Sequence, residues 1–192
     1  MSMGHPTPGY EMLVVSKETG EPVAQGETGE LWMRGTRGIQ LFLEYFDNPE
    51  ANASSFTDDG WFKTGDMVKV VEGGNVVYTD RDKDLLKVGG ENVSAREVED
   101  ACRTVPGIAE VAVVGKQHEF LSMVPVAFVI KGPGATEDDS AFEKAIISAC
   151  AESLADFKVP RAVYVVEEFP RATLEKVAKN ALREMADSYP AV

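Results

Sequence analysis

The sequence predicts an α+β fold in two parts, a small antiparallel β-rich module over residues 1–80 and a compact α+β domain over residues 85–192. Two observations lead to this prediction. Short apolar runs broken by Gly and Pro fill the first part, which is typical of strands in a small sheet or a β-barrel-like module. Beyond residue 80, strand-like and helix-like patterns alternate, as in a domain whose helices pack on one sheet. A charged run separates the patterns, and we expect residues 81–84 to connect the two parts.

Alternation of apolar and polar residues predicts three strands in the first part, at 10–15, 29–35 and 75–78. Residues 48–56 can form one short helix, because Pro49 falls in the first turn, where proline is tolerated. Residues 4–9 are predicted to form a connecting loop. A module of about 70 residues has only a marginal hydrophobic core of its own. We therefore expect it to be the end of a larger domain.

The second part begins with a predicted strand at 85–88 and a turn at Gly89-Gly90. Ser94 and Glu97 have the spacing of a capping box, in which both side chains bond free backbone donors at a helix start. The helix that follows is apolar on one face and is expected to end at Pro106-Gly107. Periodicity then predicts strands at 108–115, 124–130 and 162–166, and helices at 139–155 and 174–186.

Composition is that of an ordinary globular protein and argues against several classes. Of the 192 residues, 44% are hydrophobic and 27% are charged, and no apolar run approaches the roughly 20 residues needed to span a bilayer. The first residues lack the features of a secretory signal, so we expect a cytoplasmic protein. The formal net charge of -13 argues against a nucleic-acid partner. Local basic patches can still bind an anionic ligand.

Neither the cysteines nor the histidines indicate a metal site. Cys102 and Cys150 each fall in a stretch with helical periodicity, and we expect reduced thiols rather than a disulfide or metal ligands. His5 and His118 have no partners at metal-ligand spacing. The sequence therefore predicts no metal site in this chain.

The residues that indicate chemistry begin with Thr64-Gly65-Asp66. In isolation this tripeptide is typical of a turn, because Gly adopts positive φ and Asp bonds its own backbone. Its context adds an ordered series of short motifs along nearly the whole chain. They are Gly29-Glu30-Leu31-Trp32-Met33-Arg34-Gly35, Asn48-Pro49-Glu50, Thr64-Gly65-Asp66, Asp80-Arg81, Lys87-Val88-Gly89-Gly90-Glu91-Asn92 and a closing segment from Phe169 to Arg183.

This series resembles the adenylate-forming superfamily of acyl-CoA synthetases, luciferases and peptide-synthetase adenylation domains. The resemblance implies the C-terminal portion of such an enzyme, with the remaining β-rich end of a large N-terminal domain followed by a small mobile C-terminal domain. The Gly89-Gly90 segment is more similar to fatty-acyl and carnitine-type CoA ligases than to peptide-synthetase domains. That similarity favours CoA as the acceptor.

The resemblance implies two nucleotide contacts in the first part and at its end. Asp66 would hold the ribose hydroxyls of ATP and AMP, since an ionised carboxylate can accept two hydrogen bonds from a cis-diol. Arg81 would contact the same nucleotide through its planar guanidinium. The alternative for Arg81 is a surface ion pair with Asp82 or Asp84.

In the family that the chain resembles, the C-terminal domain turns between two half-reactions, and the pivot falls at the position of Lys83. Lys87, Gly89 and Gly90 would face the active site in the thioester-forming state. Glycine there lets a pantetheine chain pass close to the backbone because no Cβ intrudes. The alternative is an ordinary β-turn, which is compatible with that role.

The closing segment resembles the family pattern Pro-Arg-x-x-x-Gly-Lys-(apolar)-x-Lys-x-x-Leu-Arg, which places Lys176 at the catalytic lysine. Its ammonium would stabilise the charge that develops as a carboxylate attacks the α-phosphate of ATP. The alternative is a lysine on an amphipathic helix. Glu175 departs from the pattern, where Gly is usual, and we expect it to alter the loop or to neutralise Lys176 in part.

The resemblance implies an ATP-dependent acid–CoA ligase that acts on a small carboxylic acid and CoA. The phosphate loop, the adenine and Mg²⁺ segment and the acyl pocket of relatives have no counterpart here, so we expect Mg²⁺ to bind outside this chain and the chain alone to be inactive. Two alternatives stay open. One is a non-catalytic module that binds a partner or a nucleotide weakly, and the other is an adenylation domain that serves a carrier protein.

Overall fold

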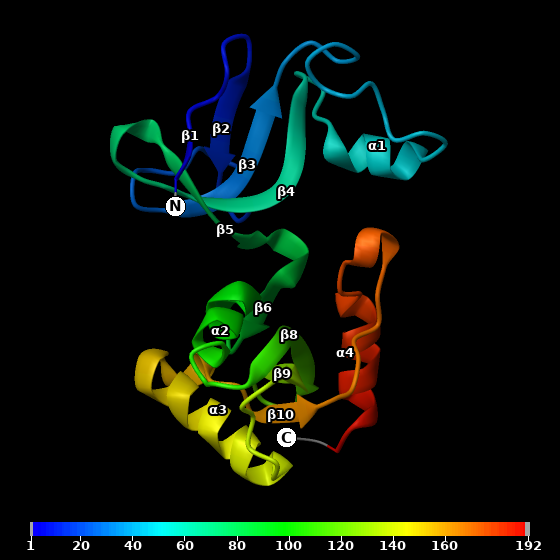
Figure 1. Cartoon of the computed structure of the whole chain (residues 1–192). Coiled ribbons are helices and arrows are strands. Elements are labelled where there is room, and N and C mark those ends of the chain that lie inside the picture. The colour runs from blue at the N-terminus through cyan, green and yellow to red at the C-terminus, as the bar shows by residue number, and fades with distance from the viewer. Residues whose placement is uncertain (1, 191–192) are drawn as a thin grey trace. The chain divides into compact units, whose positions relative to one another are not determined.

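The computed structural model describes residues 2–190, apart from the side chains of Lys83 and Leu174. The chain divides into two compact units, Met1–Lys83 and Asp84–Val192. The element labels in Figure 1 are those used below. Among the described residues, no helix combines the length and the apolar character that crossing a membrane requires.

The first unit is built on one antiparallel sheet in the order β1-β5-β4-β3-β2. The strands are β1 (Ser2–Gly4), β2 (Glu11–Val15), β3 (Thr28–Arg34), β4 (Trp61–Val70) and β5 (Val76–Arg81). The sheet is open, with β1 and β2 at its edges. One face buries Val14, Leu31, Val68 and Val76, which form the small core of this unit. The antiparallel β-rich module is confirmed.

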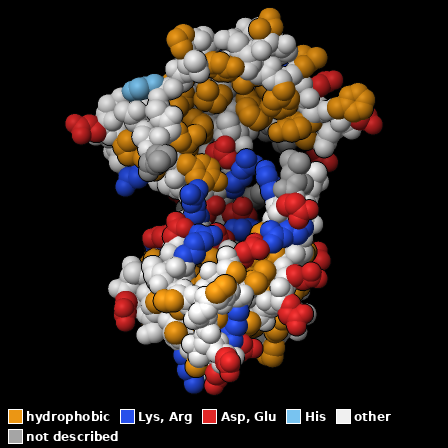
Figure 2. Space-filling view, viewed as in Figure 1, with side chains coloured by type: hydrophobic (Ala, Val, Ile, Leu, Met, Phe, Trp, Pro, Cys, Tyr) orange, Lys and Arg blue, Asp and Glu red, His pale blue; other side chains and the backbone are white. Residues whose placement is uncertain are grey.

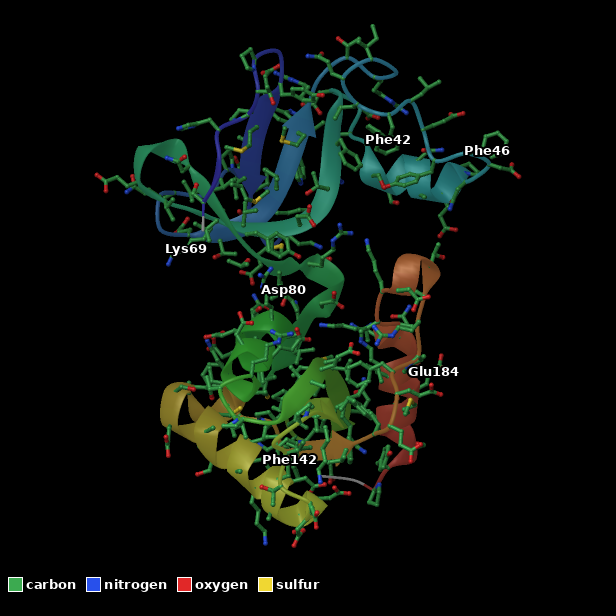
Figure 3. All side chains as sticks on the ribbon, viewed as in Figure 1. Phe42, Phe46, Lys69, Asp80, Phe142 and Glu184 are labelled. Atoms are coloured by element: carbon green, nitrogen blue, oxygen red, sulfur yellow. The ribbon has the colours of Figure 1, made fainter. Side chains whose placement is uncertain are left out.

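One helix accompanies this sheet. Helix α1 (Pro49–Ser55) begins after Asn48, whose side chain accepts a hydrogen bond from the Ala51 N–H, and Pro49 occupies the first turn as expected. The loop before α1 leaves large apolar side chains in solvent, with Phe46 94% exposed and projecting from the unit in Figure 3. In Figure 2 hydrophobic side chains gather over the surface of this unit.

The second unit has a five-stranded sheet with helices on both faces. Strand β9 (Ser122–Lys131) is central and pairs with β8 (Ile108–His118), β10 (Ala162–Val165) and β6 (Leu85–Val88), while β7 (Glu91–Ser94) extends the sheet beyond β6. β10 runs parallel to β9 and the other pairs are antiparallel. The strands at 85–88, 108–115, 124–130 and 162–166 are confirmed, with ends that differ by up to three residues.

Strand β8 explains how both faces are covered. Its alternate residues Val111 and Val113 face a core shared with α2 (Ala95–Cys102) and α3 (Asp139–Ser153), which includes the buried Phe142 (Figure 3). Ala112 and Val114 face the opposite core, which α4 (Lys179–Ser188) covers with Leu182 and Ala186. Strands buried on both faces have continuous apolar sequences, which is the pattern seen at 111–114.

Helices α2 and α3 meet at the two cysteines. Cys102 and Cys150 are free, buried thiols whose Sγ atoms lie 3.6 Å apart, within reach of an S–H···S hydrogen bond. That hydrogen bond and burial raise the pKa of Cys102, and the same contact lowers the pKa of Cys150. Both residues are part of the core of this unit.

Two predicted helix ends are corrected. Helix α2 ends at Cys102 rather than running to Pro106-Gly107, and Ser94 caps its start by accepting a hydrogen bond from the Glu97 N–H. The last helix begins at Lys179 rather than at residue 174. A short 3₁₀ turn, Thr173–Glu175, precedes it, and Glu175 adopts φ +57°, which an α-helix cannot accommodate.

Candidate active site

Thr64, Gly65 and Asp66 form a bulge inside strand β4, a strand that the sequence did not reveal. In the pairing with β3, Glu30 lies opposite Met67 and Trp32 lies opposite Lys63, so residues 64–66 all face Leu31 alone. The surplus residues are pushed out of the ladder. Gly65 adopts φ +72°, a conformation that glycine reaches without steric cost. The tripeptide is therefore a feature of a paired strand rather than a turn between elements.

Side chains hold this bulge from inside the sheet. The Thr64 hydroxyl donates to the Leu31 carbonyl oxygen at 2.7 Å and accepts from the Asp66 N–H at 3.0 Å. Glu30 accepts a hydrogen bond from the Gly65 N–H at 3.1 Å. Sequence reasoning assigned no role to Thr64 or Glu30, because both act through contacts across the sheet. The conformation of the backbone at Asp66 thus depends on residues from two strands.

Asp66 lies opposite Arg81 across the β4–β5 pair, and the two side chains meet. Arg81 Nε lies 2.9 Å from Asp66 Oδ1 in an ion pair, with the arginine side chain 53% exposed and the aspartate side chain 25% exposed. Oδ1 is buried, and it accepts no hydrogen bond from the described residues, so the contact with Nε is electrostatic only. The carboxylate therefore keeps unfilled acceptor capacity beside a half-exposed cation.

Within the first unit, the ion pairs differ from the surface pair with Asp82 that the sequence offered as an alternative for Arg81. Asp82 pairs with Lys17 at 2.6 Å, and Asp84 pairs with Arg183 at 3.1 Å. Tyr78 completes the group, because burial raises its pKa and the carboxylates of Asp80 and Asp66 add to that effect, while Arg81 opposes it. Within the first unit, Arg81 thus pairs with Asp66 rather than with Asp82.

Lys87, Gly89 and Gly90 come together at a hairpin in the second unit. β6 and β7 are joined by Gly89 and Gly90 alone, with φ values of +58° and +92°, as two-residue hairpin turns of the primed type require. The Gly89 N–H donates to the Leu121 carbonyl oxygen at 2.9 Å. A Cβ added to Gly90 would meet nothing within 4 Å. Lys87 is exposed on β6, opposite Asn92.

Lys176 lies on a different loop of the second unit, outside any helix. Its carbonyl oxygen accepts from the Ala172 N–H at 2.7 Å, and the Ala178 N–H donates to the Pro170 carbonyl oxygen at 2.8 Å, so residues 170–178 fold back on themselves. Lys176 is exposed and extended, with φ −74° and ψ 140°. The alternative of a lysine on an amphipathic helix is therefore wrong.

Lys83 is the last residue of the first unit, and its side chain lies outside the described residues.

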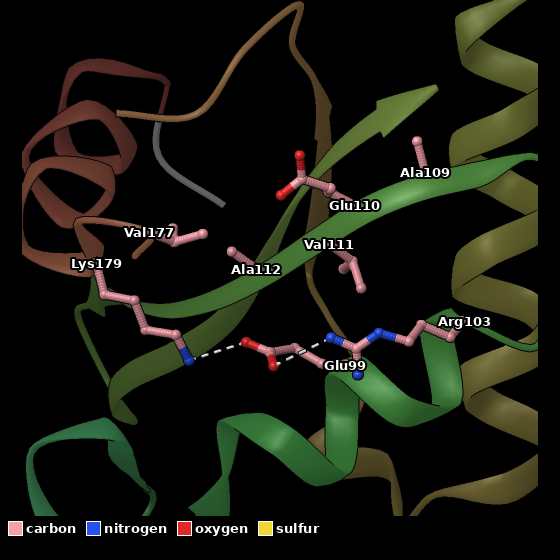
Figure 4. Close-up of a pocket in the computed structure, with 8 residues that line it drawn as sticks. All are labelled: Glu99, Arg103, Ala109, Glu110, Val111, Ala112, Val177 and Lys179. Atoms are coloured by element: carbon pink, nitrogen blue, oxygen red, sulfur yellow. Dashed lines mark ion pairs between the residues drawn. The ribbon is translucent and has the colours of Figure 1, made fainter. Parts of the chain in front are cut away.

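Ion pairs hold both sides of this loop to the sheet and to α2. Arg171 Nη2 lies 2.7 Å from Glu110 Oε1 on β8, and Lys179 Nζ lies 2.8 Å from Glu99 Oε1 on α2. A cavity of about 280 Å³ opens between them, with Val177 in its lining (Figure 4). These ion pairs anchor the loop at Arg171 and Lys179, on either side of Lys176.

The Lys179–Glu99 pair predicts a measurable coupling. Glu99 is nearly buried, accepts from the Val113 N–H at 3.0 Å and has Arg103 at 3.6 Å. Lys179→Met should lower the free energy of unfolding by about 1–3 kcal/mol, because it leaves a buried carboxylate short of its strongest partner. Adding Glu99→Gln should recover part of the loss in a double-mutant cycle.

Urea unfolding of the 192-residue chain measures this coupling. The control is Arg161→Met, which removes an exposed ion pair with Asp156 and should cost at most about 1 kcal/mol. A Lys179→Met effect no larger than the control would show that the pair does not hold the loop.

Glu175 gives a second stability prediction. Its φ of +57° lies in the left-handed region, which costs a non-glycine residue about 1–2 kcal/mol. Glu175→Gly removes that strain. Glycine also raises the conformational entropy of the unfolded chain, which offsets part of the gain in folding stability. We expect Glu175→Gly to be about 1 kcal/mol more stable than Glu175→Ala, which loses the same exposed side chain and keeps the strain. Equal urea midpoints for the two variants would contradict this.

Comparison with known proteins gives the family. A model of the AMP-binding enzyme C-terminal domain matches residues 97–176. A propanoyl:CoA ligase from Rhodococcus jostii, whose substrate is a methyl-dioxo-octahydroindenyl propanoate, is 42% identical over 86% of this chain and 31% of its own length. The chain contains an AMP-binding enzyme C-terminal domain, and its homologues include acyl-CoA ligases.

Two further relatives are similar to the chain over nearly its whole length. The putative acyl-CoA ligase YdaB of Bacillus subtilis is 40% identical over 96% of this chain and 35% of that protein. The crystal structure of ATP-bound MatB from Rhodopseudomonas palustris superposes with a TM-score of 0.84 at 36% identity, over 97% of this chain and 36% of MatB. The chain thus spans about a third of the length of these relatives and corresponds to the C-terminal portion of the family.

Proposed function

We propose that this chain acts as part of a longer ATP-dependent acid–CoA ligase. In the reaction, a carboxylate attacks the α-phosphate of ATP, pyrophosphate leaves, and the CoA thiol then displaces AMP to form the thioester. The chain would supply one nucleotide contact, the pivot and the lysine of the first step. The family assignment and the placement of Asp66 support this proposal.

The observation that carries the proposal is the unfilled acceptor capacity of Asp66. A buried carboxylate oxygen that accepts no hydrogen bond is costly unless a ligand satisfies it. A ribose diol provides two O–H donors at the spacing of one carboxylate. Arg81 covers this oxygen through a flexible, half-exposed side chain, which can turn toward ribose or phosphate oxygens and open the carboxylate to the nucleotide. The residues present therefore fit a nucleotide.

Lys176 would act in the first step. Within the described part of the chain it makes no ion pair, so its charge is available to a ligand. Its ammonium would stabilise the negative charge that develops on the carboxylate and α-phosphate oxygens. No ion pair among the described residues joins it to Glu175, whose exposed side chain adds a negative charge nearby.

The second step would use the hairpin. Gly89 and Gly90 present backbone without Cβ atoms, which suits the passage of a pantetheine chain, and exposed Lys87 would lie beside it. Lys83 would be the pivot that presents the lysine loop in one step and the hairpin in the other.

The Mg²⁺ that accompanies ATP would bind outside this chain. Among the described residues, no group of three or more His, Cys, Asp or Glu side chains is placed to hold a metal. We place the protein in the cytoplasm, where ATP and CoA are available.

A product assay on the full-length protein that contains this chain tests the function. We expect AMP release that requires both a carboxylic acid and free CoA, across a panel of aliphatic and aromatic acids. Acid-dependent pyrophosphate release without AMP release in the presence of CoA would indicate a carrier-protein acceptor. No acid-dependent product with any member of the panel would favour a non-catalytic module.

A further inference from the structure

Glu30 is a nearly buried carboxylate in the middle of β3, with 8% of the residue exposed. Both of its oxygens accept hydrogen bonds. Oε1 accepts from the Gly65 N–H and Oε2 accepts from the Trp32 indole Nε1–H, each at 3.1 Å. In the described part of the chain no Lys or Arg forms an ion pair with it. A carboxylate held at such depth by two neutral donors is costly, which calls for a reason other than stability.

The reason lies in the bulge. The surplus residues of β4 take the Gly65 N–H out of the ladder with β3, and Glu30 reaches across to accept it. The next N–H, that of Asp66, is taken by the Thr64 hydroxyl. The Glu30 and Thr64 side chains therefore bind two successive backbone N–H groups, and these hydrogen bonds fix the backbone position of Asp66. Without Glu30 the Gly65 N–H would be unpaired in a partly buried site.

We propose that Glu30 is a positioning residue for nucleotide binding, acting through Gly65 on Asp66. This rests on the proposed role of Asp66 at the ribose. Glu30 does not touch the nucleotide in this scheme. It fixes the bulge so that the Asp66 carboxylate faces the ribose hydroxyls in one orientation, which is what discrimination between ribose and deoxyribose requires.

The two hydrogen bonds that Glu30 accepts explain why a carboxylate is needed at this position. Glu30 faces two N–H donors at once, and only an ionised carboxylate accepts at both oxygens. Glutamine has the same shape but presents one oxygen and one NH₂ group, so one of the two donors must face another donor. Removing the indole donor with Trp32→Phe should relieve that conflict, because the glutamine oxygen can then accept from Gly65.

The test compares ATP with 2′-deoxyATP and 3′-deoxyATP as substrates of the full-length protein. The readout is the ratio of kcat/KM for ATP to that for each analogue, which is independent of the amount of folded enzyme. In Glu30→Gln we expect a roughly tenfold lower kcat/KM for ATP and a ratio that falls toward one. Trp32→Phe combined with Glu30→Gln should restore a large part of the ratio.

Glu27→Gln is the matched control. Glu27 also accepts a backbone hydrogen bond, from the Ala24 N–H at 2.8 Å, but it is exposed and lies before β3. Its substitution should leave the ratio unchanged. If Glu30→Gln yields no active enzyme, Glu30→Asp provides the comparison. The shorter carboxylate cannot reach both donors, so the ratio of kcat/KM for ATP to that for each analogue should again fall toward one.

The outcomes separate this inference from the proposed function. An Asp66→Asn enzyme with the wild-type ratio would contradict the role of Asp66 itself. An altered ratio in Asp66→Asn with an unaltered ratio in Glu30→Gln, or in Glu30→Asp where that variant is used, would overturn the role of Glu30 and leave the proposed function standing. An altered ratio without any recovery in the double variant would show that the paired donors are not the reason for the carboxylate.

Discussion

Lys176→Ala in the full-length protein is expected to slow acyl-adenylate formation by about 10²- to 10³-fold and to leave thioester formation from a supplied acyl-adenylate close to the wild-type rate. The ammonium would stabilise charge that exists only while the carboxylate attacks the α-phosphate. That extra charge has left with pyrophosphate before CoA attacks the adenylate. Lys176 lies in an exposed, folded-back loop, so its truncation should not disturb the core.

Two single-turnover measurements separate the steps. Pyrophosphate release from ATP and acid reports the first, and acyl-CoA formation from the purified acyl-adenylate reports the second. Lys144→Ala, which removes an exposed lysine from α3, should change neither. Equal losses in both steps for Lys176→Ala would exclude a role confined to adenylation.

Asp66→Asn is expected to lower kcat/KM for ATP by about 10- to 100-fold, mainly through a higher KM. The amide replaces a charged double acceptor by one acceptor and one donor, and it leaves Arg81 without the carboxylate that it pairs with. The loss should be smaller for 2′-deoxyATP and 3′-deoxyATP, which lack one of the hydroxyl donors.

Initial-rate kinetics with the three nucleotides measure this effect. Asp59→Asn is the control, since Asp59 is an exposed aspartate just before β4. A variant at Asp66 that loses the same factor with all three nucleotides would show that the carboxylate does not hold the ribose.

The sequence predicted correctly those elements that are determined by residues close together in the chain. The strand at 85–88 and the Gly89-Gly90 hairpin follow from apolar alternation and turn chemistry, and Ser94 caps α2 as its spacing predicts. Strand β4 was missed because Thr64-Gly65-Asp66 has the composition of a turn. What turns it into a bulge is a set of contacts from Glu30 and Leu31 on β3, far away in sequence.

The start of the last helix was also mispredicted because of contacts between residues far apart in the sequence. Apolar periodicity extends back to residue 174, but the segment before Lys179 is folded back by the Arg171–Val177 bridge and by ion pairs to Glu110 and Glu99. The candidate site residues were named from the order of their motifs, and their shared role stays a prediction. The pairing of Asp66 with Arg81 was not predictable, since it depends on the register of β4 against β5.

The most direct measurement is a crossed comparison of the two half-reactions in Lys176→Ala and Gly90→Leu, because our central claim is that one chain serves both steps with different groups. A Cβ at Gly90 meets nothing within the unit, so the leucine should obstruct a ligand rather than the fold. Gly134→Leu carries the same positive-φ strain, also in open space, and is the matched control. We predict that Lys176→Ala loses only adenylation and that Gly90→Leu loses only thioester formation, while Gly134→Leu keeps both. Parallel losses of both steps in both variants would contradict the division of labour between the loop and the hairpin.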